Sequence, residues 1–220
     1  MKFCHYSPMK CIICGFYACY DDFPVCRRCL SDFQKLFSAR CPKCGKTASM
    51  CECTDKSKAL FFFNSPAAKK LLYTVKSNAD RKMIRFLAEL MIKVNGIDPK
   101  SFDAVTFVPR SAKNRRRYGY DQSKELAKAV SDLFDLPLIA PLKRLKGQPQ
   151  KLLSSAKRFE NIKNLYQINK LPDPLPKRVL LIDDICTTGA TLSACASILR
   201  REMGCAVVTT VLAKTYLMTN

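Results

Sequence analysis

Long hydrophobic runs are missing from this sequence of 220 residues. No stretch of about twenty apolar residues occurs, which excludes an ordinary membrane-spanning helix. The initial segment MKFCHYSPMKCIIC also lacks the apolar core of a signal peptide. We therefore expect a cytoplasmic protein, with peripheral association at the inner face of the cytoplasmic membrane left open. Without a secretion signal, the 13 cysteines are expected to be metal ligands or core thiols rather than disulfides.

Acidic residues are scarce as well. The chain has 18 Asp+Glu against 38 Lys+Arg, a net charge of +20. Hydrophobic residues make up 48% and charged residues 25%, so a packed core is expected and disorder is not. The length suits one full domain and a small module. The change in composition predicts a Cys-rich zinc-binding module over 1–55 and an α/β domain over 56–220.

Ten of the 13 cysteines precede residue 54, and eight of them form close pairs. The pairs are Cys11/Cys14, Cys26/Cys29, Cys41/Cys44 and Cys51/Cys53. A C-x-x-C pair can direct two thiolates from one tight turn to the same tetrahedral zinc ion. The simplest arrangement is sequential, with the first two pairs forming one Zn²⁺ site and the last two forming a second.

Two alternatives to this arrangement stay open at the level of sequence. Spacing also allows a cross-braced pairing, and the tighter spacing of Cys51 and Cys53 makes the second site the less certain one. Redox pairs of the thioredoxin type would need one pair beside a βαβ unit, rather than four pairs in a short segment. We expect a structural role for one or two Zn²⁺ ions.

Beyond residue 55 the pattern of apolar residues is that of an α/β domain. Short apolar runs predict strands over 59–63, 103–109, 178–183 and 205–213. Helical spacing of apolar residues follows over 66–75, 83–94, 121–134 and 188–203. Strands that alternate with helices predict a doubly wound parallel sheet.

The segment VLLIDDICTTGATL (179–192) joins a buried strand to a helix. Its two carboxylates, Asp183 and Asp184, can accept hydrogen bonds from the two hydroxyls of a ribose. The following loop offers threonine hydroxyls, a glycine and the free N–H groups of a helix start, which together suit a phosphate group. The phosphate-binding candidates are Thr187, Thr188, Gly189, Ala190 and Thr191. The alternative is a strand with solvated acids followed by an ordinary helix cap.

This segment resembles the phosphoribosyl pyrophosphate (PRPP) fingerprint of type I phosphoribosyltransferases. The whole layout, a multi-cysteine module before such a domain, resembles the ComF (ComFC) family of competence proteins. VPRSAKNRRRYGYDQS (108–123) resembles the family segment that ends in RGFNQ, with Asp121 in place of Asn. QKLLSSAKRFENIKN (150–164) resembles its Q-x-x-L-S-x-x-x-R-x-x-N loop.

The resemblance implies a type I phosphoribosyltransferase-like parallel sheet flanked by helices, with a small N-terminal zinc-ribbon module. It also implies binding of PRPP with Mg²⁺. Asp183 and Asp184 would contact the ribose diol or act as a base. Candidates for pyrophosphate or DNA contacts are Lys76, Arg110, Lys113, Arg115, Arg116, Arg117, Tyr120, Lys157 and Arg158.

The positive charge belongs mainly to the α/β domain, with 30 Lys+Arg against 13 Asp+Glu after residue 55. Two dense basic stretches lie at 110–117 and 143–170, and the aromatic residues Tyr118, Tyr120, Phe159 and Tyr166 lie among them. Cations interleaved with aromatic rings suit single-stranded DNA.

Three functions compete. The first is a ComF-like protein that handles single-stranded DNA on the cytoplasmic side during natural transformation and binds PRPP as substrate or regulatory ligand. A DNA-translocating motor protein is a further expected partner. The second is a phosphoribosyltransferase of nucleobase salvage with an acceptor that the sequence does not identify. The third is an interaction module with a vestigial PRPP site.

Overall fold

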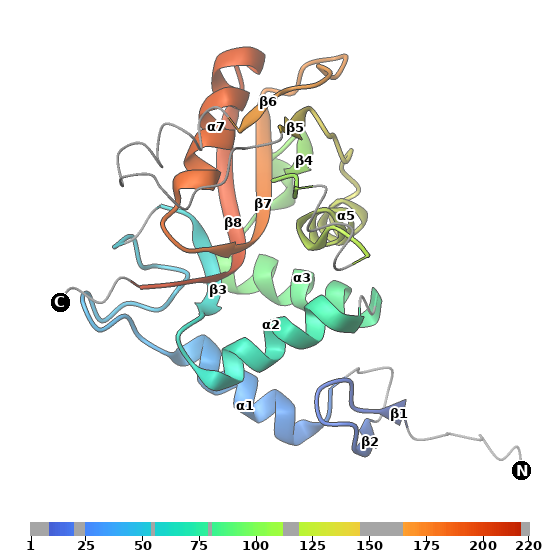
Figure 1. The fold of residues 1–220 in the computed structure, drawn as a ribbon, viewed down its shortest axis with the longest axis vertical. Helices are drawn as coiled ribbons and strands as arrows, with labels where there is room; N and C mark the ends of the chain where they lie inside the picture. The colour runs from blue at the N-terminus through green and yellow to red at the C-terminus, as the bar shows by residue number, and fades with distance from the viewer. Residues whose placement is uncertain are drawn as a thin grey trace, which may run out of the picture.

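A sheet of four parallel strands forms the centre of the computed structural model, which describes residues 9–19, 25–53, 56–78, 81–111, 119–145 and 165–216. The strands are β3 (Lys58–Phe62), β4 (Ala104–Phe107), β7 (Arg178–Cys186) and β8 (Ala206–Lys214). They lie in the order β3-β8-β7-β4, as Figure 1 shows. The predicted parallel sheet flanked by helices is confirmed.

Helices cover both faces of this sheet. They are α2 (Pro66–Asn78), α3 (Arg81–Asn95), α5 (Gln122–Phe134) and α7 (Ala190–Met203), with a short 3-10 turn η1 (Pro99–Ser101). Alternate residues of β7 enter the two halves of the core. Leu180 and Ile182 pack in the half that contains α3 and α5, whereas Val179 and Leu181 pack in the half that contains α7. This double burial explains the unbroken apolar run of β7.

A short antiparallel hairpin, β5 (Leu142–Arg144) and β6 (Tyr166–Ile168), stands beside the sheet. The sequence did not predict it. Tyr166 is buried in the core half that contains α7, and Arg144 lies over its ring at 5.4 Å from the centroid. The expectation that Tyr166 stacks on unpaired bases is therefore wrong. The predicted loop at 150–164 lies outside the described residues.

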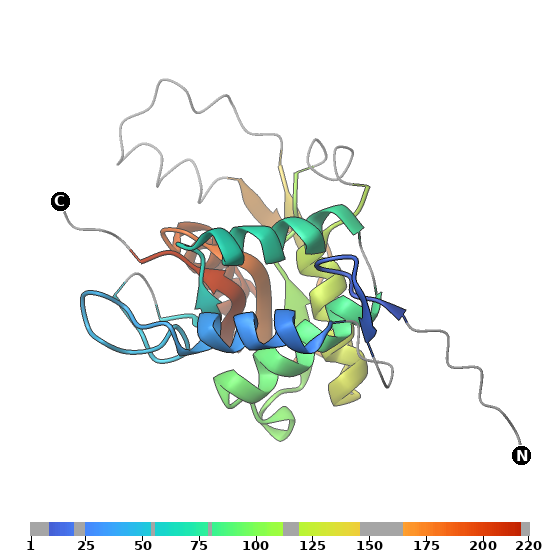
Figure 2. The same cartoon turned by 90° about the horizontal axis from the view of Figure 1, so that it is seen from below.

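The N-terminal segment contains a small hairpin, β1 (Met9–Lys10) and β2 (Tyr17–Cys19), and helix α1 (Arg27–Ser38). Helices α1, α2 and α3 lie toward the lower end of the molecule in Figure 1, and Figure 2 shows the molecule from that side. The Phe37 ring of α1 lies 6.2 Å from that of Phe61 in β3. Cys41 and Cys51 instead join the α7 half of the core, so the two cysteine segments pack into different halves. The domain boundary at residues 55 and 56 stays a prediction.

None of the helices in the described part of the chain combines the length and apolarity needed to cross a membrane.

Candidate functional site

Asp183 and Asp184 lie side by side near the carboxyl end of β7. Both are largely buried. The hydroxyl of Ser123 donates to Oδ1 of Asp183 at 2.7 Å, and the Asp184 N–H donates to the same oxygen at 2.9 Å. Burial raises the pKa of Asp183 well above its ordinary value, and the charge of Asp184 raises it further. Asp183 therefore has a strong tendency to bind a proton. Asp184 has a different hydrogen-bond partner.

That partner is Arg110, whose guanidinium forms an ion pair with Asp184. Arg110 follows β4, and its backbone N–H donates to Oδ2 of Asp121 at 3.0 Å. Asp121 is also the N-cap of α5, where Oδ1 accepts from the N–H of Lys124 at 3.4 Å. One buried carboxylate therefore fixes the start of α5 and the loop that carries Arg110.

The loop between β7 and α7 forms a small pocket of about 30 Å³ that Asp183 also lines. Thr187 and Thr188 are exposed, and Gly189, with a φ of 75°, immediately precedes α7. This left-handed conformation suits glycine. The first N–H groups of a helix have no carbonyl partner within the helix, and such donors suit an anion. Here the Ala190 N–H donates to the Thr188 hydroxyl at 3.5 Å.

The residue that follows β8 forms two hydrogen bonds with this loop and with the end of β7. The Thr215 N–H donates to the carbonyl oxygen of Cys186 at 2.9 Å, and the Thr215 hydroxyl donates to that of Thr187 at 2.8 Å. Thr215 was not among the predicted site residues. Neither was Ser123, because their roles depend on contacts between distant parts of the chain.

The other predicted site residues differ in how well they are described. Arg110 reaches Asp184, and Tyr120 is half-buried just before the N-cap of α5. Lys76 lies on α2, but its side chain is outside the description. Six basic candidates lie outside the described residues altogether: Lys113, Arg115, Arg116, Arg117, Lys157 and Arg158. The ligand roles of all these residues stay predictions.

The cysteines form two groups of four, in the sequential arrangement. One group contains Cys11, Cys14, Cys26 and Cys29, and the other contains Cys41, Cys44, Cys51 and Cys53. In each group the ligand atoms all lie within 4.8 Å of one another. Four thiols at this spacing match the tetrathiolate chemistry of structural zinc. We call these groups the first and the second cysteine cluster.

Each cluster begins with the same turn. The Gly15 N–H donates to the Cys11 carbonyl and the Gly45 N–H to the Cys41 carbonyl, both at 2.8 Å, with φ values of 75° and 69°. Burial alone raises the pKa of Cys41, but backbone N–H groups of Cys44 and Lys43 outweigh it and lower the pKa to about 7. The same balance lowers the pKa of Cys11 to about 6. Burial raises the pKa of Cys29 and of Cys51, which belong to the same two clusters. One thiol of each cluster therefore loses its proton first, and the thiolate is the form that binds a metal.

A larger hollow of about 650 Å³ lies beside the first cysteine cluster, away from the β7–α7 loop. Its lining includes Phe16, Arg27, Arg28 and Lys70, with Asp32 as the acidic member. Phe16 is 75% exposed. The hollow therefore groups an exposed aromatic ring with three basic side chains.

The chain is similar to known proteins along most of its length. A family profile described as "Phosphoribosyl transferase domain" matches residues 120–216. Competence protein ComFC of Streptococcus pneumoniae is 27% identical over 212 residues, covering 84% of this chain and 90% of the relative. Competence protein F of Haemophilus influenzae is 27% identical over 186 residues, covering 81% and 80%. Among solved structures, orotate phosphoribosyltransferase from Aeropyrum pernix is 22% identical, with 66% and 64% of the two chains covered and a TM-score of 0.41.

Proposed function

We propose that this chain, a homologue of the ComFC and competence F proteins with a phosphoribosyl transferase domain, binds PRPP with Mg²⁺ and handles single-stranded DNA on the cytoplasmic side during natural transformation. The observation that carries the proposal is the position of two buried carboxylates near the carboxyl end of β7, next to the small pocket of the β7–α7 loop.

The loop suits the ribose 5-phosphate part of PRPP. The phosphate would occupy the pocket lined by Thr187, Thr188 and Thr191, where the start of α7 supplies N–H donors. The ribose hydroxyls would form hydrogen bonds with Asp183 and Asp184, because an ionised carboxylate accepts from a hydroxyl and a protonated one can accept or donate. Because Asp183 lines the same pocket, one ligand can reach both groups.

Arg110 would then serve the pyrophosphate. Its guanidinium forms an ion pair with Asp184. When ribose hydroxyls take over that carboxylate, the guanidinium becomes available to the developing charge of the leaving group. Mg²⁺, when bound with PRPP, would neutralise part of the same charge. Whether the ligand is consumed or only sensed depends on an acceptor.

Calorimetric titration with PRPP, with and without Mg²⁺, tests this site. We expect magnesium-dependent binding that Asp184→Asn weakens at least tenfold. Asp135→Asn is the matched control, because Asp135 is exposed and lies beyond α5, in a left-handed conformation that asparagine tolerates. Equal PRPP affinity in wild type and Asp184→Asn would contradict the proposed site. Absence of binding would leave the vestigial-site alternative.

A nucleobase-salvage phosphoribosyltransferase is the second candidate, favoured by the family profile over 120–216. It requires pyrophosphate release from PRPP with one particular base. Measuring pyrophosphate release with a panel of free bases tests this directly. If no base causes release, the salvage function is wrong, while the proposal that the chain binds PRPP is unaffected.

Single-stranded DNA would use the basic surface. The net charge of +20 attracts a polyanion, and the hollow beside the first cysteine cluster adds an exposed ring among three cations. Bases stack on such rings while lysines and arginines contact phosphates. The basic stretches at 110–117 and 143–170 are further candidates, although most of their residues lie outside the described parts of the chain.

A further inference from the structure

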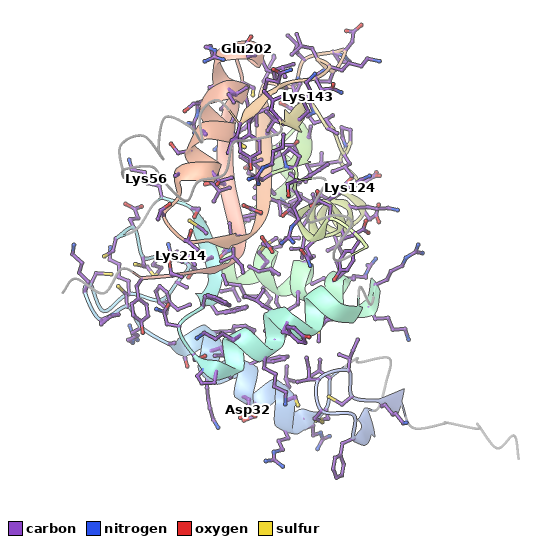
Figure 3. All side chains as sticks on the ribbon, viewed as in Figure 1. Asp32, Lys56, Lys124, Lys143, Glu202 and Lys214 are labelled. Carbon is purple, nitrogen blue, oxygen red and sulfur yellow. The ribbon has the colours of Figure 1, made fainter. Side chains whose placement is uncertain are left out.

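Lys214, at the end of β8, is completely buried. Its ammonium donates to the carbonyl oxygens of Cys51 and Ser57, the latter at 3.0 Å. Figure 3 shows Lys214 where the end of β8 meets the segment that follows α1. A buried ammonium strongly destabilises a fold unless partners hold it. The position of Cys51 is therefore important for the end of β8.

Cys51 belongs to the second cysteine cluster. The four thiols fit zinc by donor type and spacing, and zinc with four thiolates has a formal charge of about −2. A metal-ordered cluster would hold the Cys51 carbonyl in place and supply negative charge next to Lys214. Without the metal, both the carbonyl and the charge would be less well placed for the ammonium.

The same end of β8 contacts the loop between β7 and α7. Lys214 lies opposite Cys186 in the β7–β8 register. The next residue, Thr215, donates its N–H to Cys186 and its hydroxyl to the carbonyl of Thr187, at 2.9 Å and 2.8 Å. Thr187 is the first threonine of the β7–α7 loop. Two consecutive residues thus join the second cluster to the loop.

We propose that zinc in the second cysteine cluster and PRPP at the β7–α7 loop stabilise each other through Lys214 and Thr215, which act as positioning residues. The inference rests on the proposed PRPP site and adds a role for the second cluster. The first cluster packs in the other half of the core, with α1 and Phe61 of β3, so it lies outside this connection.

Linkage gives a direct test, because a ligand that binds better to the zinc-loaded protein must tighten zinc binding by the same factor. Zinc release to a chromophoric chelator is measured with and without PRPP, and with ribose 5-phosphate, which lacks the pyrophosphate. We expect both ligands to raise the affinity for one of the two zinc ions roughly fivefold or more. The other zinc ion serves as an internal control.

Variants locate the connection. Thr215→Val removes the hydroxyl but keeps the backbone, so zinc should still bind in both clusters while the coupling to PRPP is lost. Thr215→Ser should restore the coupling. Thr209→Val is the matched control on the same strand. Lys214→Met should lose the coupling as well, with Lys58→Met as its control because the Lys58 ammonium donates to Asn95 instead, at 2.8 Å.

The outcomes separate the two proposals. If wild-type protein binds neither PRPP nor ribose 5-phosphate, both the proposed function and the coupling are wrong. If it binds PRPP but both zinc ions are released equally with and without ligand, only the coupling is wrong. Coupling that persists in Thr215→Val would also overturn it, even if Lys214→Met fails to fold.

Discussion

Asp183 and Asp184 show how two adjacent carboxylates acquire different properties. Asp184 has a guanidinium partner in Arg110, whereas Asp183 is held by neutral donors from Ser123 and the backbone. Neutral donors do not offset the charge of a buried carboxylate as a cation does. A fold that keeps such a group gives up stability, which is typical of a functional site.

Asp183→Asn should therefore stabilise the ligand-free protein and weaken PRPP binding. Both donors to Asp183 use Oδ1, which an amide oxygen can replace. We expect the free energy of unfolding to rise by roughly 0.5–2 kcal/mol near neutral pH. Denaturant titration measures the stability, and calorimetry measures the affinity.

The pH dependence has a definite sign. Because burial raises the pKa of Asp183 in the folded state, wild-type stability should fall as pH rises from the ordinary aspartate pKa through the raised one. Asp183→Asn should lack this part of the fall, whereas Asp135→Asn should keep it. A stability difference between wild type and Asp183→Asn that does not change with pH would show that Asp183 is not the titrating group.

At the scale of single elements, apolar pattern predicted every strand of the central sheet and the helices that cover it. The β5–β6 hairpin was not predicted from the sequence, because each strand has only three residues. Lys143, Arg144 and Gln167 also leave no alternation of apolar and polar residues along these strands. Cysteine spacing predicted both clusters. The contacts of Ser123 with Asp183 and of Lys214 with Cys51 could not be predicted, since 60 and 163 positions separate the partners.

Helix α5 gives a test of how an element positions the site. Asp121→Ala removes the N-cap, at a cost of about 1 kcal/mol, and also the partner of the Arg110 N–H. PRPP affinity should fall together with stability. Asp98→Ala is the control, because Asp98 caps η1 in the same way, accepting from the Lys100 N–H at 3.1 Å. Equal effects of both variants on PRPP affinity would indicate a general loss of stability.

The cluster turns give a second test at this scale. Gly45 and Gly204 have φ values of 69° and 65°, and a Cβ at either would meet nothing within 4 Å. Alanine at each should therefore cost a similar 1–2 kcal/mol, roughly, from backbone strain alone. Only Gly45→Ala should also weaken zinc binding, measured by chelator competition, since only Gly45 belongs to a cysteine turn. Unchanged zinc affinity would mean that the turn does not shape the cluster.

At the scale of the whole molecule, the charge of +20 is large for a protein whose only ligand would be PRPP. A polyanion explains it better, because phosphates spaced along a backbone can contact cations spread over a surface. The sequence predicted this excess, but it did not predict the hollow that groups Phe16 with Arg27, Arg28 and Lys70. These residues come from separate segments, so only the fold brings them together.

Binding of single-stranded DNA should therefore weaken as salt increases, with a log–log slope of roughly −0.7 for each phosphate contact. Phe16→Ala should weaken binding by about 1–3 kcal/mol without changing that slope, because stacking is not ionic. Leu175→Ala is the control, as Leu175 is 50% exposed and does not line the hollow. Fluorescence anisotropy with a labelled oligonucleotide across a salt series measures both quantities. A salt-independent affinity would remove the DNA role, whereas equal affinities of Phe16→Ala and wild type would move the DNA surface away from the first cysteine cluster.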